Sequence, residues 1–514
     1  MKSQGHKFEG KVKNLRIFYT SDIHGFFSNT DYANGKTHAS GLVSCMAGFE
    51  KDGNTLIIDG GDTLQGSPFT NYLFSQRSDG ERICADVMNL AGYDFVTLGN
   101  HDFNYGRETL ERFISSLDAV CLCANIKGVK GVEETAVVTL ENGLRVGLTG
   151  ITSHFVTEWE KKENLEGITV LDAFSAAKTA LEKLHGEKVD ITLCIYHGGY
   201  ENDLSTGRLL SDSGENQGYR ICKELDFDFL LCAHQHISVE GRYIGKTFTC
   251  QPSDKARQYI ELEAKVDECG KVSTVSKTPE AAEMPHKKAI EYLAGHEKNT
   301  AQWLDVKVGH LDIPLIPASH IDMAVNGSML ANFFNQVQLE ASGADISSTC
   351  LANSVKGFDS EVSIRDIVSS YVFPNTLITL EVNREVLKKA LERCAEYFTL
   401  ENGEIRVSDS FLRPGQQHYN YDYFSGIEYV FDISRPLGER VVSIKHRGVE
   451  LSDDRRLTMC LNNYRASGAG GYECFRECKV LRTQPTEITD MIIEYVSAHK
   501  TITVDKTKWI EIIY

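Results

Sequence analysis

The first half of the chain contains five short strings in which an apolar run ends in residue types that bind metals. The apolar runs cover residues 15–19, 55–58, 95–98, 191–196 and 227–232, and each has the length and composition of a buried strand. The strings after them are Asp22-Ile23-His24, Gly60-Gly61-Asp62, Gly99-Asn100-His101-Asp102, His197-Gly198-Gly199 and His234-Gln235-His236. One such string is ordinary turn chemistry, but five in this order predict one site at the carboxyl ends of neighbouring strands.

The candidate ligand set combines carboxylates, an amide oxygen and imidazoles, which suit hard or borderline divalent ions. Its members are Asp22, His24, Asp62, Asn100, His197, His234 and His236. Cysteine is absent from the strings, which argues against a structural zinc site. Asp62 follows two glycines that permit close backbone approach, and this suits a carboxylate shared by two ions about 3.5–4 Å apart. A pair of divalent ions at this spacing is typical of enzymes that hydrolyse phosphoesters. Mn, Zn, Fe and Co are the candidate metals.

Length and charge restrict the class of protein. At 514 residues, the chain is too long for a single hydrophobic core and predicts two or more domains. The net charge of −18 argues against binding a nucleic acid polymer, whose phosphates need a basic surface, but it permits a small nucleotide neutralised by metal ions. No pattern predicts the oligomeric state.

The expected compartment follows from the cysteines and the apolar runs. The 14 cysteines are scattered, and no apolar stretch is long enough to span a bilayer, so we expect a reduced, cytoplasmic protein without membrane contact. The first residues contain no apolar run of the signal-peptide type. If a signal segment has been removed, the expected location becomes extracytoplasmic.

The pattern of predicted secondary structure changes near the middle of the chain. Residues 15–265 alternate short strands with helical segments, for example 110–117 and 173–184, which predicts an α/β sandwich. A polar stretch then precedes a predicted linker helix over 286–304. The second α/β unit has expected helices over 328–340 and 385–398 and expected strands over 376–382 and 441–446. The predicted domains are 1–275, a linker with a helix over 276–310, and 311–514.

Taken together, the five strings resemble the calcineurin-like metallophosphatase superfamily over residues 15–255. Residues 364–391, which include Tyr371-Val372-Phe373-Pro374-Asn375, are similar to the C-terminal domain of the bacterial 5'-nucleotidase family. So is the string Asn462-Asn463-Tyr464-Arg465-Ala466-Ser467-Gly468. That family also includes 2',3'-cyclic-nucleotide 2'-phosphodiesterase/3'-nucleotidases. The resemblance implies a four-layer α-β-β-α metallophosphatase sandwich followed by a mixed α/β nucleotidase C-terminal domain.

The resemblance also implies roles for individual residues. Asp62 would be shared by two divalent metal ions, one held also by Asp22, His24 and His236 and the other also by Asn100, His197 and His234. His101 would be the catalytic histidine near the scissile phosphate. Two aromatic side chains of the second domain would sandwich the base, since stacking is worth about 1–3 kcal/mol per base. Tyr464 matches one aromatic position, and Tyr419 and Phe424 are the candidates for the other.

Three departures from the 5'-nucleotidase pattern favour the cyclic-nucleotide branch. Asn104 stands three residues after His101, where typical 5'-nucleotidases carry an aspartate that orients the histidine, and the string resembles the cyclic phosphodiesterase branch instead. Asn104 would be the second catalytic residue, since asparagine can still accept a hydrogen bond from the imidazole. Residues 348–358 lack the Asn-Gly-Gly-Gly-x-Arg string, so an arginine clamp for a 5'-monophosphate is not implied. Gly470 stands where 5'-nucleotidases carry a ribose-binding acid. We therefore expect metal-dependent hydrolysis of nucleotide phosphoesters, with 2',3'-cyclic nucleotides and then 3'-nucleotides as substrates.

Three alternatives use the same strings. A 5'-nucleotidase, or a nucleotide-sugar or dinucleotide hydrolase, would act at the same dinuclear site, and so would a phosphoesterase for esters other than nucleotides. A nucleotide-binding protein without catalysis is the third alternative, and the presence of all seven ligand residues together with His101 argues against it. Product analysis on a cyclic substrate separates the nucleotidase branches, because only the cyclic branch opens the ring.

Overall fold

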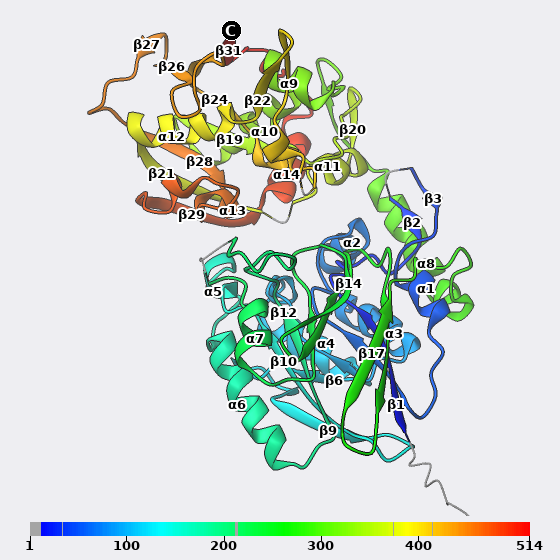
Figure 1. The fold of residues 1–514 in the computed structure, drawn as a ribbon. Helices are drawn as coiled ribbons and strands as arrows, with labels where there is room; N and C mark the ends of the chain where they lie inside the picture. Colours follow the sequence, from blue (N-terminus) through cyan, green and yellow to red (C-terminus); the bar gives the residue numbers. More distant parts are fainter. Residues whose placement is uncertain (1–11, 33, 211–213, 374, 414) are drawn as a thin grey trace, which may run out of the picture. The chain divides into compact units, whose positions relative to one another are not determined.

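The computed structural model describes residues 12–32, 34–210, 214–373, 375–413 and 415–514 (Figure 1). The chain divides into two compact units, the first ending at Thr300 and the second beginning at Ala301. Pro374, part of one string that carries the resemblance, lies outside the described residues, as do residues 1–11, on which the expectation about a signal segment depends. Within the described ranges, no helix combines the length and the apolar composition that crossing a bilayer requires.

Two main sheets face each other in the described part of the first unit. One has the order β17 (Val272–Lys277), β16 (Ile260–Val266), β1 (Lys13–Thr20), β4 (Thr55–Asp59), β5 (Phe95–Val96), β6 (Val120–Leu122) and β8 (Val132–Glu133). The other has the order β14 (Val239–Ile244), β15 (Thr247–Gln251), β13 (Phe229–Cys232), β12 (Ile191–His197), β10 (Arg145–Thr152) and β9 (Thr135–Thr139). The five predicted apolar runs are therefore confirmed as strands.

Parallel pairing brings the ends of these strands to one edge. β1 pairs in parallel with β4, β4 with β5, and β12 with β13. Every residue of β4 and β12 is buried, because both faces of each sheet are covered, and this explains why the runs are apolar throughout rather than alternating. The metal-ligand strings follow directly after these strands, so they share an edge of the sandwich.

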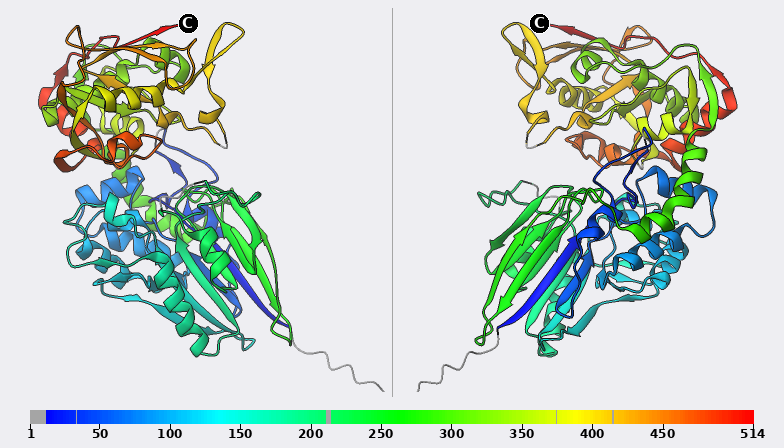
Figure 2. Two further views of the ribbon diagram at one scale, coloured as in Figure 1. Left: turned by 60° about the vertical axis from the view of Figure 1, so that its left-hand side comes forward. Right: turned by 90° about the vertical axis from the view of Figure 1, so that its right-hand side faces the viewer.

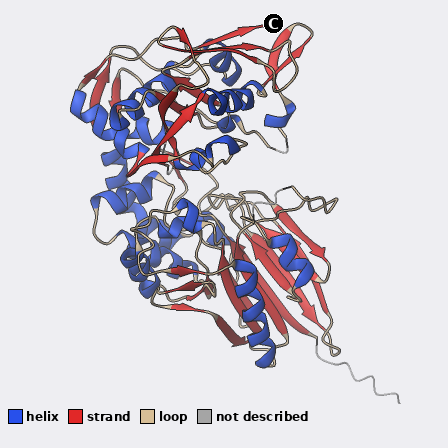
Figure 3. Cartoon of the chain, turned by 90° about the vertical axis from the view of Figure 1, so that its left-hand side faces the viewer, coloured by secondary structure: helices blue, strands red, loops and turns tan. Residues whose placement is uncertain are grey.

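The layers are held by apolar side chains on both faces of the sheets. Ile17 of β1 and Leu193 of β12 belong to the core between the two sheets. On the outer face of the second sheet, Ala177 of α6 (Ala173–Gly186) and Ile221 of α7 (Gly218–Glu224) pack in one cluster with Cys194 (Figure 3). Helices α3 (Gly80–Ala91) and α4 (Arg107–Ser116) lie together on the outer side of the first sheet (Figure 2). This is the expected four-layer arrangement.

The stretch expected to be polar linker contains a strand. β17 pairs antiparallel with β16 and forms an edge of the first sheet. Its residues alternate between half-buried and exposed, and Ser, Thr and Lys dominate it. A polar edge strand of this kind avoids pairing with other chains but leaves little apolar signal in the sequence. The predicted helix after it is confirmed as α8 (Lys287–Leu304), and its Tyr292 hydroxyl donates to Asp86 at 2.6 Å.

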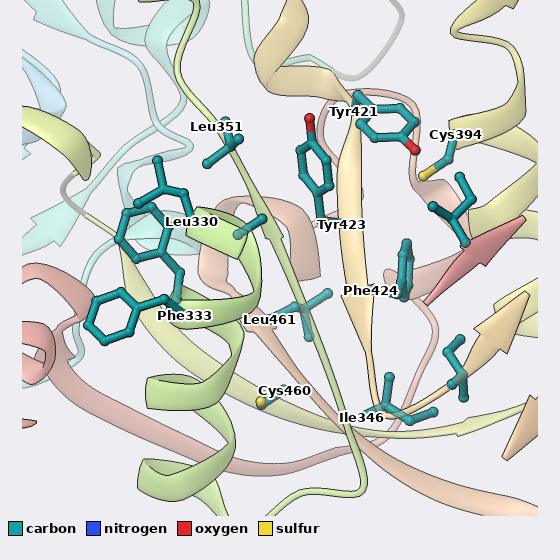
Figure 4. Close-up of a cluster of buried hydrophobic side chains, with 14 of the residues drawn as sticks. Leu330, Phe333, Ile346, Leu351, Cys394, Tyr421, Tyr423, Phe424, Cys460 and Leu461 are labelled. Carbon is teal, nitrogen blue, oxygen red and sulfur yellow. The ribbon is translucent and has the colours of Figure 1, made fainter. Parts of the chain in front are cut away.

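A central sheet organises the second unit. Its order is β24 (Asp422–Ser425), β19 (Ile346–Cys350), β28 (Arg456–Asn462), β21 (Thr376–Asn383) and β29 (Val480–Glu487). Phe333 of α10 (Met329–Ser342) packs in the core with Ile346, Phe424 and Leu461 of this sheet (Figure 4). The Ser328 hydroxyl caps α10 by accepting from the Ala331 amide.

The remaining predictions for the second unit agree with the structure. The expected helices are α10 and α12 (Arg384–Ala395), and the expected strands are β21 and β26 (Val441–His446). β26 belongs to a separate sheet with the order β27 (Val449–Glu450), β26, β25 (Glu428–Asp432) and β31 (Ile510–Ile513). The unit is thus mixed α/β, as expected.

A half-buried acid on α8 makes the stability of the first unit depend on pH. The Tyr32 hydroxyl donates to Glu297 at 2.7 Å, and burial raises the pKa of Glu297 to about 7 from 4.5. The folded state therefore holds a proton that the unfolded state lacks between these values, so stability falls as pH rises through this window. We predict that Glu297→Gln raises the melting temperature at pH 8 by about 2–4 °C and has little effect at pH 4.5. The exposed Glu291→Gln on the same helix is the control, and an equal effect of Glu297→Gln at both pH values would refute the prediction.

Candidate metal centre

The loops that follow β1 and β4 stay paired beyond the edge of the sheet. The Asp22 amide donates to the Gly61 carbonyl at 2.9 Å, and the His24 amide donates to the Asp62 carbonyl at 2.8 Å. Gly61 has a φ of +90°, and a Cβ atom there would lie 2.3 Å from the Gly99 nitrogen. The expected close approach at Gly61 is therefore present. It brings the loop after β5 into contact with the loop after β4.

Backbone strain is concentrated at the candidate ligands. Five of the seven adopt a φ between +51° and +75°, a region that residues other than glycine seldom occupy: Asp22, His24, Asp62, His234 and His236. Each such residue costs of the order of 1–3 kcal/mol. Strain of this kind persists where the surrounding structure imposes it, and it is common at functional sites.

The candidate ligands gather in two clusters, each with ligand atoms within 4.8 Å of one another. One contains Asp22, His24 and His236, and the other contains Asp62, His197 and His234. Asp62 also faces the first cluster, since its Oδ2 atom lies 3.3 Å from His197 Nε2 and 3.7 Å from His24 Nε2. One carboxylate therefore stands between the two groups of imidazoles.

Hydrogen bonds from the outer ring nitrogens orient two of the histidines. His24 Nδ1 donates to the Gln65 carbonyl at 2.9 Å, and His197 Nδ1 donates to the Gly60 carbonyl at 2.7 Å. Because a carbonyl only accepts, the Nδ1 atoms carry hydrogens and the Nε2 atoms turn toward the carboxylates. This is the arrangement in which protein histidines bind metals.

The pKa values of the two histidines shift in opposite directions. Burial lowers the pKa of His24 to about 4, so this ring is neutral near pH 7 and free to coordinate. Burial also opposes the charged form of His197, but the Asp62 carboxylate raises its pKa to about 10. Burial disfavours ionisation of Asp62 as well, yet His197 and His101 hold its pKa well below its usual range.

Two buried polar atoms test whether a cation fits. Asn100 Oδ1 and His197 Nε2 are buried and make no hydrogen bond within the described part of the chain. Leaving a buried polar atom unsatisfied costs about 1–3 kcal/mol. Oxygen and imidazole donors of this kind suit a divalent ion, which would satisfy both atoms, so the residues present fit the group.

His101 lies beside the clusters rather than in them. Its backbone amide donates to Asp62 Oδ1 at 2.7 Å, and its ring contacts the edge of the His24 ring with centroids 5.4 Å apart. His101 Nδ1 donates to Asn104 Oδ1 at 2.9 Å. The predicted pairing of His101 with Asn104 is thus present, and it leaves the Nε2 atom of His101 for a substrate.

Further contacts at the site come from Glu215, from Trp159 at the end of the short helix α5 (Val156–Trp159), and from Asp102 of the third string. Glu215 Oε1 lies 3.0 Å from His234 Nε2, and the Trp159 ring stacks on the His234 ring with centroids 5.3 Å apart. Asp102 accepts hydrogen bonds from the amides of Gly99 and Asp62, both at 2.9 Å, and so joins two loops. Glu215 and Trp159 follow no strand and belong to no repeated pattern, so only the tertiary structure identifies them.

The candidate aromatic residues lie in the second unit and differ in exposure. Tyr464, in the short helix α13 (Asn463–Ala466), is 43% exposed and Tyr419 is half-buried. Phe424 is only 1% exposed and packs in the core (Figure 4). It has no open ring face for a base, so its burial argues against the Phe424 prediction and leaves Tyr419.

A buried ion pair fixes the backbone around both tyrosines. Arg465 is fully buried, and it donates to Asp422 Oδ1 at 2.9 Å and to the carbonyls of Tyr419 and Ala469 at 2.8 Å. Because Tyr464 precedes Arg465 in the chain, one guanidinium links both segments. Gly470 has a φ of +74°, and a Cβ atom there would lie 2.0 Å from Arg465 Nη1.

Comparison with known proteins gives the same two parts. Residues 15–238 match the family model described as calcineurin-like phosphoesterase, and residues 307–477 match the model described as 5'-nucleotidase, C-terminal domain. The crystal structure of a putative 5'-nucleotidase from Staphylococcus aureus, in complex with alpha-ketoglutarate, is 30% identical. It has a TM-score of 0.88, and the match covers 97% of this chain and 99% of that one.

Two curated relatives are more distant. The 2',3'-cyclic-nucleotide 2'-phosphodiesterase/3'-nucleotidase of Salmonella typhimurium is 22% identical over 94% of this chain and 86% of its own length. The trifunctional nucleotide phosphoesterase YfkN of Bacillus subtilis is 23% identical over 95% of this chain. The chain spans only 38% of the length of YfkN.

The close contact between two loops predicts the effect of an added methyl group on metal binding. In Gly99→Ala, the new Cβ atom would lie 2.1 Å from Asp62 Oδ1 and 2.4 Å from the Asp62 backbone nitrogen, so the carboxylate and the backbone that carries it both have to move. We expect the affinity for divalent metal to fall by about 10–100-fold while the circular dichroism spectrum is unchanged. Gly295→Ala, where no atom lies within 4 Å of the new Cβ, is the control. Equal metal binding by both variants, measured by calorimetry, would show that the position of Asp62 is not critical.

Proposed function

Because the chain belongs to the calcineurin-like phosphoesterases that carry a 5'-nucleotidase C-terminal domain, we propose that it hydrolyses nucleotide phosphoesters at two divalent metal ions. The observation that carries the proposal is the position of Asp62, whose carboxylate faces both imidazole clusters. Asp22, His24 and His236 would hold one ion together with Asp62. Asn100, His197 and His234 would hold the other.

The proposed mechanism divides the work between the metal site and His101. When bound, the ions would polarise the phosphoryl group and make water a nucleophile near neutral pH. His101, oriented by Asn104 and held next to Asp62 by its own backbone amide, stabilises the developing charge or protonates the leaving sugar oxygen. The nucleoside would be held by stacking on aromatic rings of the second unit.

The proposed substrates are 2',3'-cyclic nucleotides, followed by 3'-nucleotides. Asn104 in place of an aspartate supports this choice through the resemblance. The surroundings of Gly470 support it too, since a side chain there would overlap Arg465 Nη1 and leave no room for the ribose-binding acid of 5'-nucleotidases. A relative with the cyclic activity in its name aligns along 94% of the chain.

Tyr464 and Tyr419 are the proposed base-stacking pair. Tyr464 offers an exposed ring, and Arg465 ties its helix to the Tyr419 carbonyl, so the backbone at both rings is fixed before a nucleotide arrives. Preorganised rings lose less conformational entropy on binding.

A 5'-nucleotidase is the second candidate. The relative named a putative 5'-nucleotidase has the higher identity, 30%, and is covered along 99% of its length. Both candidates use the same metal centre, so they differ only in which ester reaches it.

One substrate comparison tests the proposed function. Phosphate release from 2',3'-cyclic AMP, 3'-AMP and 5'-AMP is measured side by side with added Mn²⁺, and a separate phosphatase is included in the cyclic assay to report ring opening. We expect the cyclic and 3' substrates to dominate. Dominance of 5'-AMP would assign the chain to the second candidate, and hydrolysis of none of the three would reject both.

The role of His101 predicts a variant that loses turnover but keeps its metal. His101→Ala removes the imidazole while the backbone amide that contacts Asp62 remains. We expect kcat to fall by about 10²–10⁴-fold with unchanged metal content, measured by elemental analysis of the purified protein. Loss of metal in parallel with activity would mean that His101 acts as a ligand.

The stacking role of Tyr464 predicts an effect on nucleotides alone. Tyr464→Ala should raise KM for the nucleotide by about 10-fold, which corresponds to one lost stack. Turnover of bis(p-nitrophenyl) phosphate, which has no base, should be unchanged. Equal losses on both substrates would indicate damage to the fold instead.

A further inference from the structure

Asn104 is held on the side opposite His101 by an acid from another segment. Its Nδ2 group donates to Glu160 Oε2, while its Oδ1 atom accepts from His101. Glu160 directly follows the short helix α5 (Val156–Trp159) and lies 56 residues away in the chain. The three side chains form a continuous line of hydrogen bonds from imidazole to amide to carboxylate.

The direction of this line depends on the acid. The two ends of an asparagine amide have nearly the same shape, but only the oxygen accepts a hydrogen bond from His101 Nδ1. A carboxylate has no hydrogen to donate, so it attracts the NH₂ end of the amide and repels the oxygen. With Glu160 on one side, Asn104 therefore presents its oxygen to His101.

Glu160 is itself fixed in place. Its Oε1 atom accepts from the Lys161 amide at 2.7 Å and from Asn164 Nδ2 at 2.9 Å. Asn164 Nδ2 also donates to the Asn104 carbonyl at 2.8 Å. The carboxylate thus has partners on both oxygens, which leaves Oε2 directed at Asn104.

We propose that Glu160 is a positioning residue for the reaction. It sets the orientation of the Asn104 amide, which in turn sets the orientation of the His101 ring. Asn104 contacts His101 directly, and Glu160 acts on the imidazole through the Asn104 amide. The proposal rests on the proposed function only for the role of His101, and it is independent of which nucleotide is the substrate.

The single variant Glu160→Gln removes the carboxylate's preference for the NH₂ end of the Asn104 amide without changing the size of the side chain. Because the Lys161 amide and Asn164 Nδ2 donate to the Oε1 position, a glutamine keeps its oxygen there and presents its NH₂ group to Asn104, which no longer attracts the NH₂ end of the Asn104 amide. We expect kcat to fall by about 10–100-fold, with KM, metal content and melting temperature nearly unchanged. Glu163→Gln is the matched control, because this exposed acid in the same segment has no hydrogen bond to Asn104. An unchanged kcat in Glu160→Gln would overturn the proposal.

A double-mutant cycle separates positioning from simple bracing of the loop. Asn104→Asp alone places two carboxylates against each other and should lower kcat. Adding Glu160→Gln to it supplies a donor to the new acid, so kcat should rise by about 10-fold relative to Asn104→Asp alone. Glu160→Gln is therefore expected to lower kcat in the native protein and to raise it in the Asn104→Asp variant. If Glu160 only braces its loop, Glu160→Gln costs the same in both backgrounds, and that result would overturn the proposal.

The cycle is measured on bis(p-nitrophenyl) phosphate as well as on the nucleotides. Turnover of this ester without turnover of any nucleotide would reject the proposed function, while the reversal of sign in the cycle would still support the role of Glu160. Turnover of no ester at all would overturn both, since His101 would then have no reaction to serve.

Discussion

The convergence of carboxylates and imidazoles around Asp62 is the constraint on which the rest of the first unit depends. Buried negative charge is stable only next to compensating positive charge. Here the Asp62 carboxylate is buried between two imidazole clusters and raises the pKa of His197 to about 10. The positive φ values at the candidate ligands and the close glycine contacts are unfavourable in themselves, and the proposed binding of divalent ions would offset them.

The sandwich supplies the rigidity that this arrangement needs. Parallel strands buried on both faces end at one edge, and each loop inherits its position from the strand before it. Asp102 connects the loops through buried hydrogen bonds, and burial raises its pKa to about 6. In the second unit, the Arg465–Asp422 ion pair fixes the backbone next to Tyr464 and Tyr419 in a similar way. In both units, therefore, buried polar contacts hold the backbone that carries the candidate site residues.

The elements that can be predicted from the sequence are those whose residues form a pattern within a short stretch of the chain. Apolar runs followed by ligand residues locate the strands and the two clusters, because a parallel strand and the loop after it are contiguous in the chain. The edge strand β17 escapes prediction, since its polar alternating residues resemble a linker. Phe424 could not be separated from Tyr419, because every residue of β24 is buried and periodicity therefore assigns no open face there. Trp159 and Glu160, at the end of α5, and Glu215 come to the site from segments distant in the chain, so no spacing in the sequence indicates them.

Anomalous diffraction from crystals soaked in Mn²⁺ tests the central claim most directly. The account predicts two peaks about 3.5–4 Å apart with the Asp62 carboxylate in contact with both. His24 and His236 should lie at one peak, and Asn100 and His197 at the other. A single peak, or peaks that do not contact Asp62, would contradict the shared-carboxylate site and the mechanism derived from it.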